Sequence, residues 1–392
     1  MAGKRGNGEG SIFQDKNGRW RGVITMGINA NGMQKKKIFY GKTRKEVSEK
    51  VNQALANIKN HNCIESSKML LSEWLSHWLS TYALHDLRQS TYVSYETYIR
   101  GHILPLLGNI PLSKLEPSRI QEFYNFKLQK GRLDGKGGLD PKTIRNLHNM
   151  LHKALEQAVQ LNLIPRNPCN ATTLPKKRKK EVRILTIQEQ RQLQEAVKNE
   201  RLGIGIILDL YTGLRLGELL GLTWENIDLE RGRLSVRQTV NRLKSFDSSS
   251  NYSTRIYIGE PKTEKSKRVI PLLDEIVKML EEHQKKQEIE KQNSMGVYQD
   301  SGFVLCNEIG EPLDPKTYQD FFKRMLKKAG LRDINFHALR HTFATRSLEK
   351  GIPAKTVSEL LGHSSITITL DLYPHVTDEL KTDAIAKLKD LL

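Results

Sequence analysis

The stretch LYTGLRLGELLGLTWENIDL, residues 210–229, places an arginine and a glutamate among leucines. Gly213 is suited to end one helix, and Arg215 then begins the next helix, with Glu218 one turn later and leucines on its apolar side. Backbone amides at a helix start also favour an anion. Arg215 is therefore a candidate anion-binding residue, and a surface arginine paired only with Glu218 is the alternative.

A second stretch, HALRHTFATRSLEKG at residues 337–351, indicates another helix with a basic face. His337 and Arg340 are three residues apart, so both side chains project from one side of that helix. His341 follows His337 by four residues, which is the spacing of a metal pair. The glutamate of the HExxH zinc motif is missing, however, and Arg340 would repel a cation. We therefore expect no metal site here.

The next segment, IPAKTVSELLGHSSITITLDLYPHV at residues 352–376, leads to a tyrosine. Gly362 is suited to end a helix in the left-handed conformation and to place His363 just beyond it. Tyr373 precedes Pro374, which pushes Tyr373 out of helical geometry. A free tyrosine has a pKa of about 10, so about one phenol in a thousand is ionised at neutral pH. A nucleophilic Tyr373 would need help from its neighbours, and a buried aromatic side chain is the alternative.

The composition favours a polyanionic partner. The 392 residues include 63 Lys and Arg against 44 Asp and Glu, a formal charge of +19, which suits nucleic acid first and an anionic membrane second. The length predicts two or three domains. No apolar run is long enough to span a bilayer and no signal peptide is evident, which weakens the membrane alternative. Three dispersed cysteines suit a reducing cytoplasm and supply no metal site.

Residues 1–62 predict a small basic domain. Its first 60 residues hold 13 Lys and Arg against 4 Asp and Glu. Asn-Gly dipeptides at residues 17–18 and 31–32 favour hairpin turns and predict a three-stranded antiparallel sheet, and Thr43 is suited to cap the helix that follows. The strand residues would contact a DNA groove, unless they form only a solvated face: Arg19, Trp20, Arg21, Lys35, Lys36 and Lys37.

Residues 69–174 predict a bundle of four amphipathic helical segments. Ser90 and Asp140 are suited to be N-caps, and Pro117 and Pro141 are suited to the first turn. The polar faces carry side-chain types that contact phosphates and bases, although such faces are more often merely solvated: Thr91, Tyr95, Lys142, Arg145 and Asn146.

The basic run PKKRKKEV, residues 175–182, by itself resembles a nuclear import signal. Its place between two folded parts favours a linker, residues 175–183, that lies along a phosphate backbone. The residues concerned are Lys176, Lys177, Arg178, Lys179 and Lys180. From residue 184 onward the pattern is mainly helical, with β-rich stretches between residues 232 and 272.

The charged and aromatic residues of the C-terminal half, as a set, resemble the signature of the tyrosine recombinases, the integrase family: Arg215, His337, Arg340, His363 and Tyr373. The surrounding sequence, TGLRLGELLGLTW and LLGHSS, is also similar to that of the family. The family also uses a lysine in a β-hairpin. Lys262 in GEPKTEKSKRVIPL, residues 259–272, matches that place, with Lys265 and Lys267 as rivals. Gly217 departs from the serine that the family often has.

The resemblance implies a multidomain chain that is mainly α with small β-sheets. An arm-type DNA-binding domain, a three-stranded sheet plus a helix, would occupy residues 1–62, and a helical core-binding bundle residues 69–174. A mixed α+β catalytic domain would occupy residues 184–376. Residues 377–392 would form a tail helix, which in the family docks on a neighbouring protomer. Packing of this tail against its own domain is the alternative.

The expected chemistry follows from charge. A DNA phosphodiester gains negative charge in its pentavalent transition state, and preorganised cationic donors stabilise that charge. Hydrogen bonds to charged groups contribute about 1.5–3 kcal/mol each. Two arginines and two imidazoles could therefore offset the roughly 4 kcal/mol that an un-ionised phenol costs at neutral pH. His337 or His363 would relay the phenolic proton or bind the phosphate, and Lys262 is the candidate acid for the departing 5′-hydroxyl.

These features predict a site-specific DNA recombinase that works through a 3′-phosphotyrosine and a Holliday junction. It would integrate and excise a mobile element or prophage as a tetramer on core-type and arm-type sites of double-stranded DNA. A monomeric type IB-like topoisomerase and a non-catalytic DNA-binding regulator are the alternatives. No phosphate-binding loop GxxxxGK[ST] is present, and we expect neither cofactor nor metal. The resemblance also implies a small excisionase, DNA-bending accessory proteins and the bacterial cytoplasm as the location.

Overall fold

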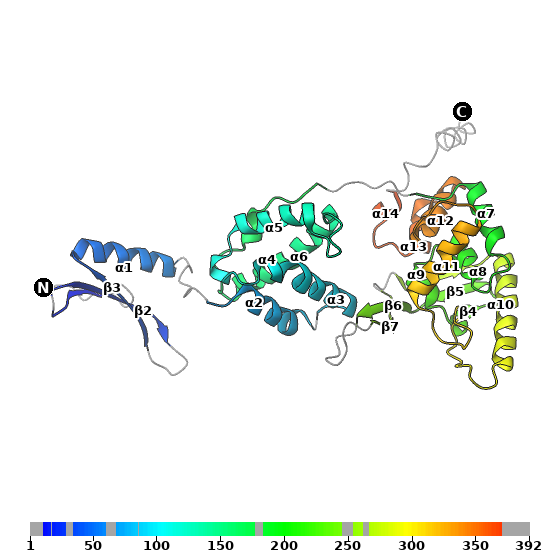
Figure 1. Ribbon diagram of the computed structural model, residues 1–392, viewed down its shortest axis with the longest axis horizontal. Coiled ribbons are helices and arrows are strands. Elements are labelled where there is room, and N and C mark those ends of the chain that lie inside the picture. The colour runs from blue at the N-terminus through cyan, green and yellow to red at the C-terminus, as the bar shows by residue number, and fades with distance from the viewer. Residues whose placement is uncertain are drawn as a thin grey trace, which may run out of the picture. The chain divides into compact units, whose positions relative to one another are not determined.

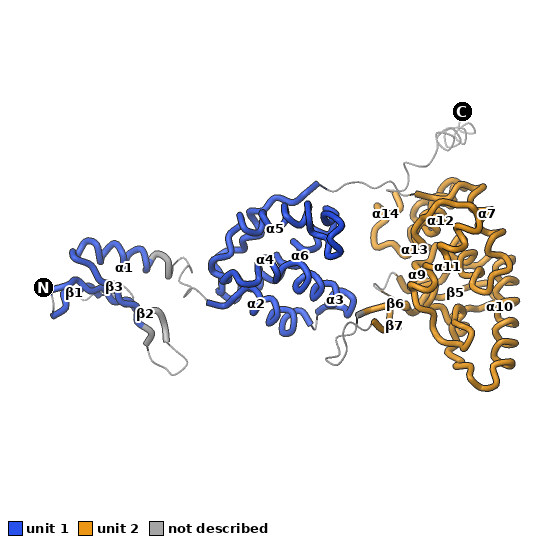
Figure 2. The backbone as a smooth tube through the Cα atoms, viewed as in Figure 1, with its two compact units in different colours: residues 1–178 blue, residues 179–392 orange. Residues whose placement is uncertain are grey.

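The computed structural model describes residues 11–16, 18–28, 34–59, 68–84, 86–176, 183–244, 254–261 and 266–370. The chain divides into two compact units, residues 1–178 and 179–392 (Figure 2). The mainly helical architecture with small antiparallel sheets confirms the predicted fold class. The finer division into arm-type, core-binding, linker, catalytic and tail segments stays a prediction.

The first unit begins with the predicted three-stranded sheet, in the order β1-β2-β3 (Figure 1). Its antiparallel strands are β1 Ser11–Gln14, β2 Trp20–Ile28 and β3 Gln34–Gly41. Gly18 has a φ of 78° in the first turn, as the Asn-Gly dipeptide predicted. The second dipeptide, at residues 31–32, lies outside the described residues. Helix α1, Arg44–Lys59, covers one face of the sheet through Val47 and Val51.

The rest of the first unit is helical, and its apolar faces meet in one core. The elements are α2 Leu71–Trp78 with its π-helical extension η1 Leu79–Ala83, α3 Gln89–Tyr98 with η2 Ile99–Ile103, α4 Leu104–Leu107, η3 Leu112–Lys114, α5 Pro117–Lys130, α6 Pro141–Gln160 and η4 Pro168–Ala171. The buried indole of Trp74, in α2, donates a hydrogen bond from Nε1 to the Ala154 carbonyl of α6 at 3.0 Å and so joins these two helices.

The predicted helix starts in this bundle were right in three of four cases. Asp140 caps α6 by accepting a hydrogen bond from the Lys142 N–H at 2.9 Å, and Pro117 and Pro141 open their helices. The prediction for Ser90 was wrong. The extended residue before α3 is Arg88, with ψ 148°, so Ser90 already has helical geometry and cannot cap.

The second unit surrounds a larger core with helices and two small sheets. One sheet has the order β4-β5-β8 and the other pairs β6 with β7. The elements are α7 Ile187–Val197, α8 Gly203–Thr212, α9 Leu216–Leu220, η5 Trp224–Asn226, β4 Ile227–Asp228, β5 Arg233–Val236, β6 Thr239–Lys244, β7 Thr254–Gly259, β8 Arg268–Pro271, α10 Asp274–Asn293, α11 Pro315–Lys328, α12 His337–Glu349, α13 Ala354–Leu361 and α14 Thr367–Leu370. Among the described helices, none is long and apolar enough to cross a membrane.

Helix α8 lies at the centre of this unit and packs against α12. It ends at Gly213, whose φ of 61° is left-handed, as predicted, and α9 starts after Arg215. The packing around Gly217 explains why this chain has glycine where the family often has serine. A Cβ atom at residue 217 would lie 2.9 Å from the Val240 carbonyl oxygen, so a larger residue would force β6 to shift away from α9.

Gly213→Ala tests the turn between α8 and α9. The added Cβ would lie 2.6 Å from carbons of both Leu361 and Phe343, whereas Gly330, with a φ of 70°, has no described atom within 4 Å of an added Cβ. Gly330→Ala is the matched control, because it carries the same backbone strain without the collision. We expect losses in the free energy of unfolding of about 1–2 kcal/mol for Gly330→Ala and about 2–5 kcal/mol for Gly213→Ala. Equal losses in denaturant titrations would contradict the packing argument.

Candidate active site

Arg215 stands at the start of α9 and is held from two sides. Its Nη1 donates to Glu218 Oε1 at 2.6 Å, and its backbone N–H donates to Glu218 Oε2 at 3.1 Å. Its Nη2 donates to the Gly362 carbonyl at 3.1 Å. The predicted pairing with Glu218 is therefore present, but it does not leave Arg215 as an isolated surface pair, because the guanidinium also reaches the end of α13.

Arg340 reaches the same place from α12. Its side chain is buried, with Nη1 donating to the Gly213 carbonyl at 2.6 Å and Nη2 to the Leu361 carbonyl at 2.8 Å. Leu361 and Gly362 are consecutive, so the two guanidinium groups bond neighbouring carbonyls at the C-terminal end of α13. A common anion site between the two arginines is consistent with this geometry.

The predicted histidines lie beside these arginines. His337 is the first residue of α12, and its ring meets the ring of His341 edge-on with the centroids 4.5 Å apart. His363 follows the left-handed Gly362, as predicted, and its Nδ1 lies 2.8 Å from Thr369 Oγ1. Thr369 belongs to α14 and is buried, so α14 fixes the orientation of the His363 ring.

Burial and neighbouring positive groups together set the pKa values in this cluster. Burial, followed by the charges of Arg340 and Arg215, lowers the pKa of His363 to about 4. His337 keeps solvent-exposed surface, yet loss of hydration around its ring and the neighbouring His341 and Arg340 lower its pKa to about 4 as well. Burial and the nearby Arg215 lower the pKa of Arg340 to about 9. Such shifts are expected of buried basic groups that have like charges nearby.

Sequence reasoning missed two charged residues beneath the cluster. Arg268 of β8 donates from Nη2 to Glu218 Oε2 at 2.9 Å, with both side chains buried. Burial alone would raise the pKa of Glu218, but Arg268 and Arg215 together lower it. Asp209 of α8 is fully buried, and neither of its carboxylate oxygens has a hydrogen-bond partner among the described residues. Burial raises the pKa of Asp209 well above its usual value.

Two members of the predicted catalytic set, Lys262 and Tyr373, lie outside the described residues, as does the rival Lys265. The other rival, Lys267, forms an ion pair with Glu260, with Nζ 3.2 Å from the carboxylate. The C-terminal tail, residues 377–392, is also outside the description. The four described members are thus brought together, and the roles assigned to all six stay predictions.

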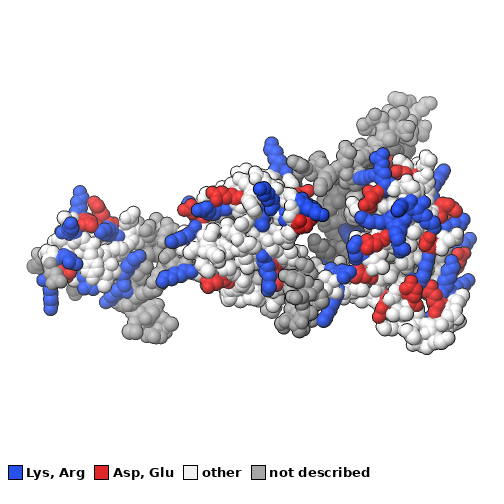
Figure 3. Space-filling view, viewed as in Figure 1, with Lys and Arg blue, Asp and Glu red and all other residues white. Residues whose placement is uncertain are grey.

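The residues proposed for DNA contact in the sheet are largely solvent-facing. Arg21 lies over the rings of Phe13 and Tyr40, with its Cζ 5.7 and 5.9 Å from their centroids. Arg19, Lys36 and Lys37 are exposed and Trp20 is half-buried. The side chain of Lys35 lies outside the description. Figure 3 shows Lys and Arg side chains spread over both units on the face in view, with Asp and Glu between them.

In the helical bundle the proposed contact residues differ from one another. Lys142 and Asn146 are exposed, and Thr91 is half-buried. Tyr95 is half-buried and stacks on Trp78 with centroids 6.0 Å apart. Arg145 donates from Nη2 to the Pro175 carbonyl at 2.8 Å and so holds the start of the predicted linker. Within that linker Lys176 is exposed, and residues 177–182 are not described.

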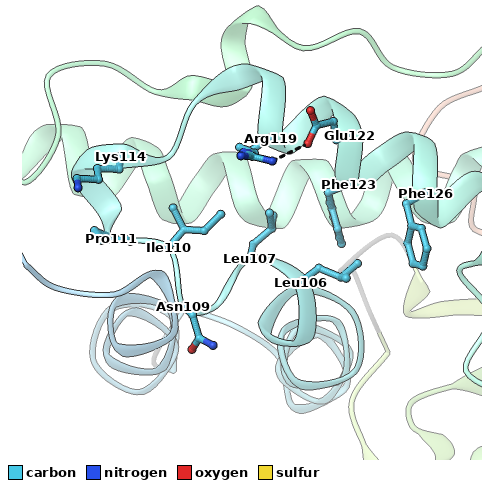
Figure 4. A pocket seen from close by; sticks show the side chains of 10 residues that line it. All are labelled: Leu106, Leu107, Asn109, Ile110, Pro111, Lys114, Arg119, Glu122, Phe123 and Phe126. Carbon is cyan, nitrogen blue, oxygen red and sulfur yellow. Dashed lines mark hydrogen bonds and ion pairs between the residues drawn. The ribbon is translucent and has the colours of Figure 1, made fainter.

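A pocket of about 490 Å³ lies in the first unit, apart from this cluster (Figure 4). Leu106, Phe123 and Phe126 are among its apolar lining residues, and Arg119 and Glu122 form an ion pair at 3.2 Å on its wall. None of the residues that we predicted to be catalytic lines this pocket. No group of three or more His, Cys, Asp or Glu among the described residues is arranged to hold a metal ion.

Comparison with known proteins adds independent findings. Residues 182–379 match the phage integrase family, and residues 70–128 match the N-terminal SAM-like domain of phage integrases. The chain is 34% identical to a protein from Caldanaerobacter subterraneus subsp. tengcongensis named tyrosine recombinase XerC-like. That match covers 96% of this chain and 97% of the relative.

Two solved structures show the same fold. The Tn1549 transposon integrase, in complex with transposon right end DNA, superposes with a TM-score of 0.65 at 24% identity, over 82% of this chain and 99% of that one. A lambda integrase tetramer bound to a Holliday junction gives a TM-score of 0.58 at 21% identity, over 94% and 96% of the two chains.

The lowered histidine pKa values predict acid sensitivity. In the unfolded chain a histidine has a pKa of about 6.5, whereas His337 and His363 in the folded chain have pKa values of about 4. The unfolded state therefore binds more protons as the pH falls from about 6.5 towards about 4, and the free energy of unfolding decreases across that window.

The double variant His337→Gln, His363→Gln should lose less stability across this window than the wild type. Denaturant titrations at half-unit pH steps would measure the difference. The same pair at pH 8 is the control, because both imidazoles are neutral there in either state. Parallel pH profiles would contradict the assignment of neutral histidines to this site.

Proposed function

The chain belongs to the phage integrase family of tyrosine recombinases, and on this premise we propose how its residues recombine DNA. As a member of the family it is a site-specific recombinase, an enzyme that breaks and rejoins DNA strands. The observation that carries the proposed active site is the meeting of Arg215 and Arg340 at neighbouring carbonyls of α13. His337 and His363 flank them, and Tyr373 and Lys262 complete the proposed set.

In the proposed reaction, the Tyr373 oxygen attacks the scissile phosphorus. A phosphorus–oxygen bond to the tyrosine forms while the bond to the 5′-oxygen breaks, which leaves a 3′-phosphotyrosine and a free 5′-hydroxyl. Lys262 protonates the departing oxygen, and a neutral imidazole of His337 or His363 accepts the phenolic proton. The reverse attack by a 5′-hydroxyl of another strand rejoins the DNA, so no nucleotide is consumed.

The arginines supply the charge that this step needs. Each guanidinium offers a planar fork to the non-bridging phosphate oxygens. Both groups are already held in place by protein carbonyls and by Glu218, so little reorganisation accompanies the growth of negative charge. A bound phosphate would also favour the protonated form of both histidines, whose pKa values are lowered by burial and by neighbouring positive groups.

Chain length supports Tyr373 as the nucleophile. Tyr373 is four residues beyond Thr369, and each residue of extended chain spans at most about 3.6 Å, so their Cα atoms are within about 14 Å. Thr369 itself contacts His363 at 2.8 Å. The chain between Thr369 and Tyr373 is therefore short enough for the proposed attack on a phosphate at this cluster.

The remaining parts have proposed roles in assembly on double-stranded DNA. Residues 1–62 would bind arm-type sites and residues 69–174 core-type sites, while the basic segment 175–183, between the core-binding bundle and the catalytic domain, follows the phosphate backbone. We propose a tetramer on a Holliday junction, with residues 377–392 docking on a neighbouring protomer, in the bacterial cytoplasm. A mobile element or prophage would be the substrate, and an excisionase with DNA-bending proteins would direct excision.

A nicked suicide substrate tests the catalytic assignment. The wild type should form a covalent protein–DNA adduct, and Tyr373→Phe should form none, because the variant lacks the attacking oxygen. Tyr211→Phe is the matched control, since Tyr211 is an exposed tyrosine of the same unit and its variant should form adduct normally. Adduct formation by Tyr373→Phe, resolved on denaturing gels, would refute Tyr373 as the nucleophile.

A second measurement separates the proposed function from its alternatives. Recombination between two sites on one plasmid is expected of a recombinase, whereas relaxation of supercoils without exchange is expected of a monomeric topoisomerase. DNA binding with neither product and no adduct would favour a non-catalytic regulator.

A further inference from the structure

Arg268 is a buried arginine that the catalytic set does not include. Its side chain is 7% exposed, and it lies in β8, six residues beyond Lys262. Strand β8 lies next to α13, whose C-terminal end receives Arg215 and Arg340. Arg268 thus joins the strand after the predicted lysine hairpin to α9, which follows Arg215, and to α13, whose carbonyls receive both arginines.

All three nitrogens of its guanidinium face protein partners. Nε donates to the Leu360 carbonyl at 2.5 Å, and Nη1 donates to the Ser266 carbonyl at 3.0 Å. Nη2 donates to Glu218 at 2.9 Å. Because each of the three guanidinium nitrogens of Arg268 already bonds a protein acceptor, we expect Arg268 not to contact DNA itself. Any effect on the reaction has to pass through these neighbours.

The most direct route is through Glu218, which two arginines share. Its Oε1 accepts from Arg215 Nη1 at 2.6 Å, and its Oε2 accepts from Arg268 Nη2 at 2.9 Å. Arg215 and Glu218 alone would be a neutral pair, and a carboxylate that close would oppose the approach of a phosphate to Arg215. With Arg268 included, the three side chains carry one net positive charge.

We propose that Arg268 is a positioning residue that offsets the charge of Glu218, so that Glu218 can fix Arg215 in place while Arg215 still attracts the scissile phosphate. This inference rests on the proposed function. The buried pair Arg268–Glu218 would then have a role in the reaction as well as in folding. Glu218 would orient Arg215, and Arg268 would offset the repulsion between the Glu218 carboxylate and the phosphate.

Simple anchoring is the competing explanation. Arg268 also bonds the Leu360 carbonyl, one residue before the carbonyl that receives Arg340, so its loss could merely loosen α13. The two explanations differ in how Arg268 and Glu218 couple. If Arg268 compensates the charge of Glu218, then neutralising Glu218 should restore part of the reaction rate that is lost when Arg268 is replaced. If Arg268 only anchors α13, the effect of replacing Glu218 should add to the effect of replacing Arg268.

The experiment is a double-mutant cycle with Arg268→Met, Glu218→Gln and the double variant, in the full-length chain. Single-turnover adduct formation is measured on the nicked suicide substrate at saturating protein, after DNA affinity and folding have been measured for each variant. We expect Arg268→Met to slow adduct formation by about tenfold to a hundredfold, the rate equivalent of one charge-assisted contact. The double variant should react faster than Arg268→Met alone.

Three results would overturn the inference. They are a wild-type rate for Arg268→Met, a double variant slower than Arg268→Met, and a folded Arg268→Lys variant slowed more than about tenfold although it keeps the charge. If Arg268→Met does not fold, the rate of the Arg268→Lys variant tests the inference. Arg231→Met, at an exposed arginine, is the matched control. Absence of adduct with the wild type would instead refute the proposed function.

Discussion

Two arginines of like charge share one small region of this protein, and the second unit is built to hold them there. Arg215 and Arg340 approach from different helices and bond consecutive carbonyls at the end of α13. Burial, and after it the repulsion from Arg215, lowers the pKa of Arg340. Such an arrangement costs free energy in the absence of an anion, and it persists because carbonyl groups, Glu218 and a close-packed core fix both side chains. In the proposed function, a phosphate bound between the two guanidinium groups would relieve this cost.

Two left-handed glycines allow that geometry. Gly213 ends α8 and presents its carbonyl to Arg340, while Gly362 ends α13 and presents its carbonyl to Arg215. A helix end normally leaves carbonyl groups without partners. Here the carbonyl groups at two helix ends accept hydrogen bonds from two guanidinium groups. Both the carbonyls and the guanidinium groups thereby gain hydrogen-bond partners. The same turns direct the chain so that segments more than 100 residues apart meet.

Local signals in the sequence were sufficient for part of this arrangement. Glycine at a helix end, aspartate before a proline and the three-residue spacing of His337 and Arg340 each have a local physical meaning, and the structure agrees with them. Ser90 was misassigned because a serine two residues into a helix looks like a cap when the start is not known. Arg268 and Glu218 are 50 residues apart and meet only through the packing of β8 near α9, so no spacing rule could pair them. Asp209 was missed because it lies inside an apolar helix, where nothing in the sequence indicates which partner it would face.

The charge distribution would also link the proposed proton transfer to DNA binding. Without DNA, burial and then positive neighbours lower the pKa values of His337 and His363, so both imidazoles are neutral and weak bases. A phosphate bound between the arginines adds negative charge beside the same imidazoles and favours their protonated form. Their pKa values would then move towards neutrality, where a general base is most effective. In the proposed mechanism, the imidazoles would thus become competent proton acceptors only when the substrate is present. This would couple ionisation of Tyr373 to occupation of the site and restrain reaction of the phenol in the absence of DNA.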